Sequence, residues 1–274
     1  MVQQQRIVEA SPPVLLQEQI GSIAILTLNR PQQRNCLSES LIRALHDALD
    51  AIAEDDGIRG VVIAANGPAF SSGHDLKELT AHRAFSDDGG RAYFADLMTL
   101  CSGMMQKIVR LPKPVIAAVQ GIATAAGCQM VASCDLAIAS ERASFATPGV
   151  DIGLFCSTPT VALTRNIPRK QAMEMLLTGE AISANRARDI GLINRVVPAG
   201  TEIEAAIALA TQIARKSAHT IKLGKAAFYQ QAELGLAEAY QLASQVMTEN
   251  MMAADAIEGI GAFIEKRDPV WKDR

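Results

Sequence analysis

A stretch of small residues, GIATAAGCQMVASCD from Gly121 to Asp135, has a composition that suggests chemistry. Glycine and alanine let a backbone approach a bound group closely, so the stretch has the composition of a backbone cradle. Its central polar side chain is Gln129, an amide that neither gives nor takes a proton at neutral pH. The stretch is therefore suited to holding a group, and its central side chain is not suited to acid–base work.

Other reactive residue types do not form a recognisable site. Ser, His and Asp occur together in SSGHDL, but neighbours this close in one segment cannot converge into a catalytic triad. The histidines show no HxxxH or HxH spacing, so no metal site is expected. The five cysteines have no CxxC pair, which indicates reduced thiols and a cytoplasmic protein.

Composition narrows the class of protein. The 274 residues are 49% hydrophobic, enough for a sizeable core, and the net charge is -3. The chain contains no basic run that would track a phosphate backbone, so nucleic acid is not an expected partner. No window approaches the roughly 18 apolar residues that a membrane span requires. Residues 1–12 lack the apolar segment of a signal peptide, and we interpret them as a loose leader.

The hydrophobic pattern predicts an α/β protein. Residues 14–20 and 23–28 have the pattern of a hairpin, Ser38 can cap a following helix, and the apolar run 60–65 is typical of a strand buried on both faces. Buried strands alternate with covering helices as far as Gly153, after which the chain is mostly helical, with one last strand, LINRVV, before Pro198. From Thr201 onward the pattern is helical, with more apolar surface than one short core requires. We expect a core over 13–200 and a helical oligomerisation region over 201–274.

Six motifs, in this order, resemble those of the crotonase (enoyl-CoA hydratase/isomerase) superfamily. They cover nearly the whole chain, and their shared order makes the resemblance specific. The motifs are LNRPQQRNCLS (28–38), AFSSGHDLKEL (69–79), KPVIAAVQGIATAAGCQMVASCDLAIAS (113–140), FATPGVDIGLF (145–155), MEMLLTGEAISANRARDIGLINRVVP (173–198) and FIEKRDPVW (263–271).

The resemblance implies a fold and a ligand. The fold is a ββα spiral core with two roughly perpendicular sheets, followed by a C-terminal helical trimerisation region, in a homotrimer or a dimer of trimers. The ligand is an acyl-CoA thioester of fatty acid metabolism, with coenzyme A as part of the substrate and no prosthetic group.

In the family two backbone N–H groups hold the thioester oxygen, and the matching positions are His74 and Ala126. Such donors stabilise negative charge on the oxygen, and one of them is worth about 100- to 1,000-fold in rate. The positions that match the family's CoA contacts are Gln33, Arg34, His74, Asp75, Leu76 and Lys77, with Phe263 and Lys266 reaching the CoA of a neighbouring subunit.

The chain departs from the family at the two catalytic glutamates, whose positions hold Gln129 and Gly149. Hydration of a C=C bond needs one group to activate water and another to protonate carbon, so the ordinary lyase reaction is not expected. Asp151 is the best candidate for a replacement base, because it lies on the same side as Gly149 if that stretch is extended. Cys156 and Ser157 are candidate nucleophiles, although no histidine is evidently placed to activate either.

Two functions therefore stay open from the sequence. The first is an acyl-CoA enzyme that keeps the two-amide oxyanion hole and catalyses a reaction other than standard hydration. The second is a non-catalytic acyl-CoA-binding or assembly protein.

Overall fold

The computed structural model describes residues 12–274, and the expected leader therefore lies largely outside the described residues. Two β-sheets organise the core. The larger sheet has six strands, and all its pairs are parallel except β1 with β2. In spatial order they are β1 (Leu15–Ile20), β2 (Ile23–Leu28), β3 (Gly60–Ala65), β5 (Val115–Val119), β7 (Leu136–Ser140) and β10 (Arg195–Val197).

The smaller sheet supplies the segments that lead into the candidate site. Its strands, in spatial order, are β4 (Ala69–Ser71), β6 (Ile122–Thr124), β8 (Ser144–Ala146) and β9 (Ile182–Ser183). Strands β4, β6 and β8 are parallel, so their C-terminal ends meet at one edge of this sheet. The expectation of a mixed α/β core with two sheets is confirmed.

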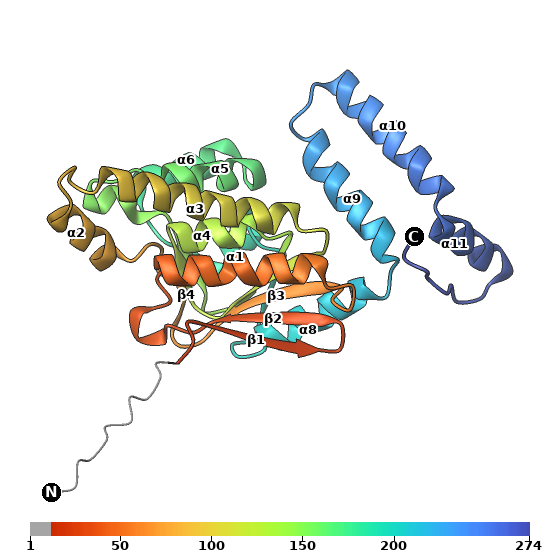
Figure 1. Ribbon diagram of the computed structural model, residues 1–274, viewed down its shortest axis with the longest axis horizontal. Coiled ribbons are helices and arrows are strands. Elements are labelled where there is room, and N and C mark those ends of the chain that lie inside the picture. Colours follow the sequence, from red (N-terminus) through yellow and green to blue (C-terminus); the bar gives the residue numbers. More distant parts are fainter. Residues whose placement is uncertain (1–11) are drawn as a thin grey trace, which may run out of the picture.

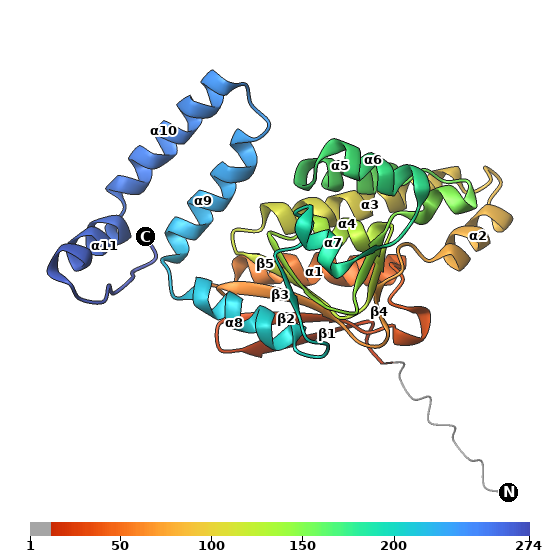
Figure 2. The ribbon, with the colours of Figure 1, turned by 180° about the vertical axis from the view of Figure 1, so that it is seen from behind.

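Helices cover both faces of the larger sheet (Figures 1 and 2). The alternate residues of β3 explain this: Val61 and Ile63 belong to the hydrophobic cluster on the α1 side, and Val62 and Ala64 to the cluster beneath α8. The helices of this part are α1 (Glu39–Glu54), α2 (Leu76–Phe85), α3 (Arg91–Arg110), α4 (Ala126–Ser133), α5 (Ser157–Asn166), α6 (Arg169–Thr178), α7 (Ala184–Asp189) and α8 (Glu202–Ala214).

Helix α8 packs with the core, although the sequence pattern grouped it with the helical region that begins at residue 201. Ala206 and Ala210 are fully buried against the larger sheet, beside Ile116 and Ile138. Small side chains on a helix let it approach a sheet closely, which explains the alanine-rich face of α8. The described part of the chain contains no helix long and apolar enough to cross a membrane.

The last three helices form an arm that projects from the core (Figures 1 and 2). They are α9 (Ala218–Gln231), α10 (Leu236–Met252) and α11 (Ala254–Glu265). A buried ion pair fixes α9 to the core: Lys225 Nζ donates to Asp135 Oδ2 at 2.7 Å and to the carbonyls of Ile108 and Lys113. Tyr229 donates to the other oxygen of Asp135 at 2.9 Å, so this carboxylate is bonded on both sides.

Burial shifts the pKa of both members of this pair. It lowers the pKa of Lys225 and raises the pKa of Asp135, and in each case their mutual attraction opposes burial. Removing the ammonium alone would leave Asp135 as a buried charge without its partner, which is costly.

We expect Lys225→Met to lower the free energy of unfolding by about 3–5 kcal/mol, because it breaks a buried ion pair from one side. The measurement is urea denaturation, followed by circular dichroism. Arg165→Ala is the matched control, because Arg165 ties α5 to Glu233 through an exposed pair, worth about 1 kcal/mol or less. Equal losses for the two variants would contradict the role assigned to the buried pair.

Candidate active site

The candidate site forms where the loop after β4 meets the start of α4. A Cβ built on Gly73 would lie 2.9 Å from the Cβ of Ala125 and 3.4 Å from the nitrogen of Ala126. One built on Gly127 would lie 2.4 Å from the carbonyl oxygen of Ser71. Any side chain at these two glycines would collide, so glycine is required for the two segments to touch.

The amide hydrogens of His74 and Ala126 are not used within the described chain. Leu37 forms a parallel β-bridge with His74: the N–H of Leu37 donates to the carbonyl of Gly73 at 2.7 Å, and its carbonyl accepts from the N–H of Asp75 at 3.4 Å. Neither of these bonds uses the N–H of His74. Ala126 is the first residue of α4, a position whose N–H has no intrahelical acceptor. Two available donors thus lie in segments that touch, at the positive end of a helix.

Ala125 holds a strained backbone conformation immediately before these donors. Its φ of 49° and ψ of -119° lie in a region that residues other than glycine rarely adopt, at a cost of about 1–3 kcal/mol. The N–H of Ala125 donates to the carbonyl of Ala146 at 3.0 Å, which ties the turn to β8. Strain of this kind persists where the surrounding structure imposes it, and it often marks functional sites.

Several buried polar atoms beside the cradle have no hydrogen-bond partner. They are both ring nitrogens of His74 and Oε1 of Gln129, which lies one turn into α4 and is 4% exposed. An unpartnered buried polar group costs about 1–3 kcal/mol, and such groups are normally satisfied by a bound molecule or water. Burial also lowers the pKa of His74, so its ring is neutral at pH 7.

Gly149 occupies a place where the fold leaves no room for a side chain. It is the second residue of the 3-10 helix η2 (Pro148–Ile152), after which Gly153, at φ 76°, turns the chain back. A Cβ at Gly149 would lie 2.6 Å from the carbonyl oxygen of Leu154 and 2.9 Å from Sγ of Cys156. The position that the sequence motifs predict for the second glutamate of the family therefore has no side chain, and neighbouring atoms fill the space around it.

The structure does not support the extended geometry on which the candidate base Asp151 depended. Asp151 lies in η2, and the residue is exposed. Its Oδ2 lies 3.1 Å from a Cβ built on Gly179, so the carboxylate is directed toward the end of α6. The alternation argument that placed Asp151 beside Gly149 is wrong, because residues of a 3-10 helix do not alternate between two sides.

Neither candidate nucleophile is paired with a base. Burial raises the pKa of the Cys156 thiol, which keeps it protonated at neutral pH, and a thiol reacts through its thiolate. Burial likewise raises the pKa of the neighbouring Cys128, to about 12. The hydroxyl of Ser157 donates to the carbonyl of Phe155 at 3.3 Å, and no imidazole is bonded to it.

The loop that contains Gln33 and Arg34, two of the predicted CoA contacts, has its backbone conformation fixed by hydrogen bonds. Arg34 and Asn35 both have φ of 51°, and the buried side chain of Asn35 accepts from the N–H of Arg30 and donates to the carbonyls of Asn66 and Ala69. Asn35 was not among the residues predicted from the sequence. Its role depends on partners 31 and 34 positions away, so its own segment carries no signal for it.

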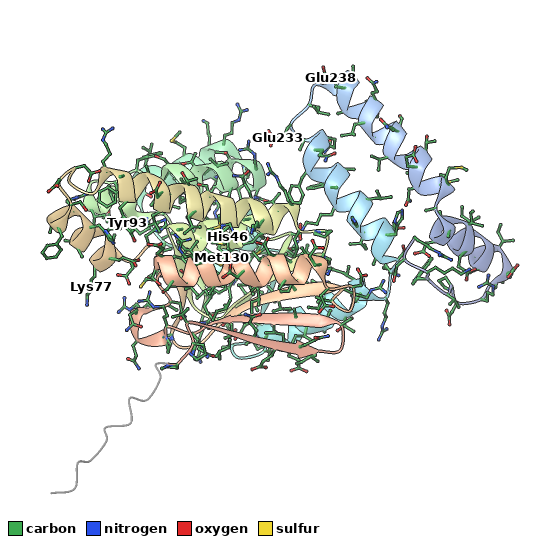
Figure 3. All side chains as sticks on the ribbon, in the orientation of Figure 1. His46, Lys77, Tyr93, Met130, Glu233 and Glu238 are labelled. Atoms are coloured by element: carbon green, nitrogen blue, oxygen red, sulfur yellow. The ribbon has the colours of Figure 1, made fainter. Side chains whose placement is uncertain are left out.

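Asp75 joins this loop to α2. Its carboxylate accepts from Arg30 at 3.1 Å and from Cys36 at 3.2 Å, and it caps α2 by accepting from the N–H of Lys77. Burial acts to raise the pKa of Asp75, but the hydrogen bonds from Cys36 and Arg30 outweigh burial and lower it. Gln33, Leu76 and Lys77 are exposed around this junction, and Lys77 projects from the start of α2 (Figure 3).

Phe263 and Lys266 lie far from the cradle within one chain. Both belong to the α11 end of the arm, on the opposite side of the molecule from α2 (Figure 1). Phe263 is 83% exposed, so its own chain covers little of it. Their expected role toward a neighbouring subunit stays a prediction.

Tyr93 was also not among the residues predicted from the sequence. It lies in the first turn of α3, and its ring stacks on His82 of α2 with centroids 3.4 Å apart. Its hydroxyl is buried without a partner, and burial, followed by the charge of Glu78, raises the pKa of Tyr93 to about 12.

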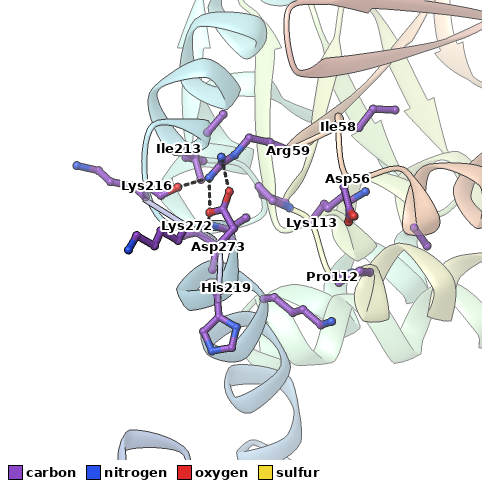
Figure 4. A pocket seen from close by; sticks show the side chains of 16 residues that line it. Asp56, Ile58, Arg59, Pro112, Lys113, Ile213, Lys216, His219, Lys272 and Asp273 are labelled. Atoms are coloured by element: carbon purple, nitrogen blue, oxygen red, sulfur yellow. Dashed lines mark hydrogen bonds and ion pairs between the residues drawn. The ribbon is translucent and has the colours of Figure 1, made fainter. Parts of the chain in front are cut away.

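A hollow of about 360 Å³ lies elsewhere, where the arm leaves the core (Figure 4). There Asp273 near the C-terminus accepts from both terminal guanidinium nitrogens of Arg59, at 2.9 and 3.1 Å, and from the N–H of Ala218. Lys216 and Lys272 point away from the hollow. No residue of the cradle lines it, so it is not the site built around His74 and Ala126. Among residues 12–274 no cluster of His, Cys, Asp or Glu could hold a metal ion.

Comparisons with known proteins identify a family that matches most of the chain. The model of the enoyl-CoA hydratase/isomerase family matches residues 18–274. The mitochondrial enoyl-CoA hydratase domain-containing protein 3 of Rattus norvegicus is 48% identical over 96% of this chain and 86% of the relative. Its Homo sapiens counterpart is 47% identical over 96% of this chain and 85% of the relative. The resemblance to this branch of the superfamily, predicted from the sequence motifs, is confirmed.

Solved structures show the same fold. An enoyl-CoA hydratase from Mycobacterium smegmatis superposes with a TM-score of 0.90 at 49% identity, over 95% of this chain and 99% of that one. The human enoyl Coenzyme A hydratase domain-containing protein 3 superposes with a TM-score of 0.89 at 47% identity, over 94% and 100%. The rat and human relatives are named as mitochondrial proteins, which contradicts the expectation of a cytoplasmic location.

Gly149→Ala should lower the free energy of unfolding by about 1–3 kcal/mol, because an added methyl group overpacks against Leu154 and Cys156. Thermal and urea denaturation measure the effect. Gly224→Ala in α9 is the control: nothing lies within 4 Å of the added Cβ, and the substitution should stabilise the helix by up to about 1 kcal/mol. Two variants of equal stability would show that the space at Gly149 is not closed.

Proposed function

Because the chain belongs to the enoyl-CoA hydratase/isomerase family, we propose that it binds an acyl-CoA thioester and polarises the thioester carbonyl with the N–H groups of His74 and Ala126. The observation that carries this proposal is the contact of Gly73 with Ala125 and Ala126, which brings the two unused donors together. Negative charge that develops on the carbonyl oxygen would be stabilised by these donors and by the positive end of α4.

The reaction in this proposal is not standard hydration. Hydration requires a group that activates water and a group that protonates carbon, and carboxylates usually do this work. Gln129 has no titratable proton, and Gly149 has no side chain and no room for one. The Gln129 amide keeps a different capacity: it can donate to and accept from a bound acyl group.

Coenzyme A would lie along the loop of Gln33 and Arg34 and the start of α2 at Asp75, Leu76 and Lys77. The unusual backbone of this loop, fixed by Asn35, supports the assignment. The exposed Lys77 offers a cation to the phosphates of coenzyme A.

A second candidate is a non-catalytic acyl-CoA-binding or assembly protein. The closed space at Gly149 favours it, because the fold excludes the second usual carboxylate. The two candidates differ in turnover: a panel of enoyl- and acyl-CoA thioesters analysed by mass spectrometry gives products for an enzyme and unchanged thioesters for a binding protein.

Gly73→Ala should weaken the binding of butyryl-CoA at least about tenfold and leave the weak binding of free coenzyme A nearly unchanged, because the added methyl group separates the two donors from one oxygen. Isothermal titration measures both affinities. Gly21→Ala is matched, since it also places alanine at a positive φ, with nothing within 4 Å and far from the cradle. Wild-type protein that binds no acyl-CoA, or Gly73→Ala with wild-type affinity, would contradict the proposed oxyanion hole.

We further propose that the arm docks on a second copy of the chain. Its helix α11 presents a largely exposed apolar face: Ile257, Ile260 and Ile264 are 65%, 47% and 73% exposed. An apolar face of this kind on a projecting arm is typical of an assembly surface. The size of the assembly, a trimer or a dimer of trimers, belongs to this proposal.

The double variant Ile260→Lys/Ile264→Lys should dissociate the assembly, because two charges would have to be buried at the interface. Sedimentation equilibrium measures the mass. Glu18→Lys, an exposed charge change on β1, is the control and should keep the wild-type mass. A wild-type protein that sediments as a monomer would contradict the docking of the arm.

A further inference from the structure

The direction of the His74 N–H is set by the peptide that joins His74 to Gly73. The carbonyl of this peptide accepts from the N–H of Leu37 at 2.7 Å. In a planar trans peptide the N–H points opposite to the carbonyl. The strong bond on the carbonyl side therefore directs the His74 donor away from Leu37, and any movement of this loop moves the donor with it.

The backbone holds the other side of His74 less firmly. The N–H of the next residue, Asp75, reaches the carbonyl of Leu37 only at 3.4 Å, which is long for a hydrogen bond. The Asp75 side chain makes shorter, charge-assisted contacts: Oδ2 accepts from Arg30 at 3.1 Å and from Cys36 at 3.2 Å. Its Oδ1 caps α2. The position of the chain after His74 therefore depends on this carboxylate.

Arg30 is itself held at both ends. Its backbone N–H donates to the side chain of Asn35 at 2.8 Å, and its carbonyl accepts from the N–H of Asn35 at 2.9 Å. Its guanidinium, on a side chain that is 19% exposed, donates to the carbonyl of Cys36 at 2.9 Å and to Asp75. A planar guanidinium fixes two groups relative to each other, which a lysine ammonium does less rigidly. Arg30 thus fixes Asp75 relative to the loop of residues 30–38.

This arrangement connects two segments to which separate contacts are assigned. The loop of residues 30–38 contains positions assigned to coenzyme A, and Asp75 directly follows the residue whose N–H is assigned to the thioester oxygen. We propose that Arg30 is a positioning residue: through Asp75 it holds the His74 N–H where that donor polarises a thioester carbonyl. This inference rests on the oxyanion hole proposed above.

The ion pair also has an electrostatic effect on the same donor. Burial acts to raise the pKa of Asp75, but the hydrogen bonds from Cys36 and Arg30 outweigh burial and lower it, so the carboxylate is ionised at neutral pH. An unpaired negative charge beside His74 would oppose the negative charge that develops on the thioester oxygen. Pairing with Arg30 offsets that charge, so the same guanidinium positions the donor and removes an opposing field.

The test compares two ligands that differ in one group. Butyryl-CoA has a thioester carbonyl, and its thioether analogue S-butyl-CoA has a methylene in the same place, which cannot accept from the donors. Isothermal titration gives the ratio of the two affinities, and infrared spectroscopy of isotope-labelled butyryl-CoA gives the carbonyl stretching frequency. For the wild type we expect butyryl-CoA to bind at least about tenfold tighter, with a carbonyl band lower in frequency than in water.

Arg30→Met should lower this affinity ratio at least about fivefold, the equivalent of one hydrogen bond, and return the carbonyl band toward its frequency in water. Arg30→Lys keeps a cation opposite Asp75 and should lose less, about twofold. Arg43→Met is the matched control, because Arg43 pairs with Glu39 on the exposed side of α1, and it should change neither readout. A purely structural role of Arg30 would weaken both ligands together and leave the ratio and the band unchanged.

An Arg30→Met protein with the wild-type ratio and carbonyl band overturns the inference, while the proposed function stands. A wild-type protein that binds neither ligand, or binds both equally with an unshifted band, overturns both. If Arg30→Met does not fold, Asp75→Asn replaces it, since asparagine can still cap α2. Its ratio should fall at least about threefold, because the bond to Arg30 loses its charge on one side, and an unchanged ratio overturns the inference.

Discussion

The close approach of two backbone segments, the loop after β4 and the start of α4, is the constraint on which the candidate site depends. It requires glycine at positions 73 and 127, since any Cβ there would collide with the opposite segment. It also requires Ala125 to hold a strained conformation, which the bond to Ala146 and the packing of α4 impose. The result is a pair of main-chain donors whose position does not depend on a flexible side chain.

The side chains around this backbone feature are chemically consistent with one another. Burial keeps His74, Cys128 and Cys156 uncharged. At Gly149, Leu154 and Cys156 occupy the space that a side chain with a carboxylate would need. The positions that the sequence predicts for the two family glutamates thus hold an amide and a glycine without room for a side chain.

The arm is held to the core by a few strong interactions, and its own surface is apolar. Asp135 accepts hydrogen bonds from Lys225 and Tyr229 of α9. Asp273 accepts from the Arg59 side chain and from a backbone N–H in the first turn of the same helix. These bonds fix where α9 begins, and the helices after it extend away from the core (Figure 2). The exposed face of α11 is thereby presented at a defined distance from the cradle, where a second copy of the chain could use it.

Local patterns in the sequence determined much of this protein. The hairpin, the two-faced strand β3, the helices α1 and α3 and the Gly/Ala cradle were all predictable, because period-2 and period-3.6 patterns and small residues act over short distances. The sequence motifs also predicted that Gln129 and Gly149 stand where the family has its two catalytic glutamates.

Only the tertiary structure decided the features that depend on contacts between distant segments. It assigned α8 to the core through a face of alanines that fits the sheet, and it directed Asp151 away from Gly149 through a 3-10 turn. It also filled the space at Gly149 with atoms that the left-handed Gly153 brings back. These outcomes depend on how distant segments fit together in space. A local sequence pattern does not indicate which distant segment will pack against it.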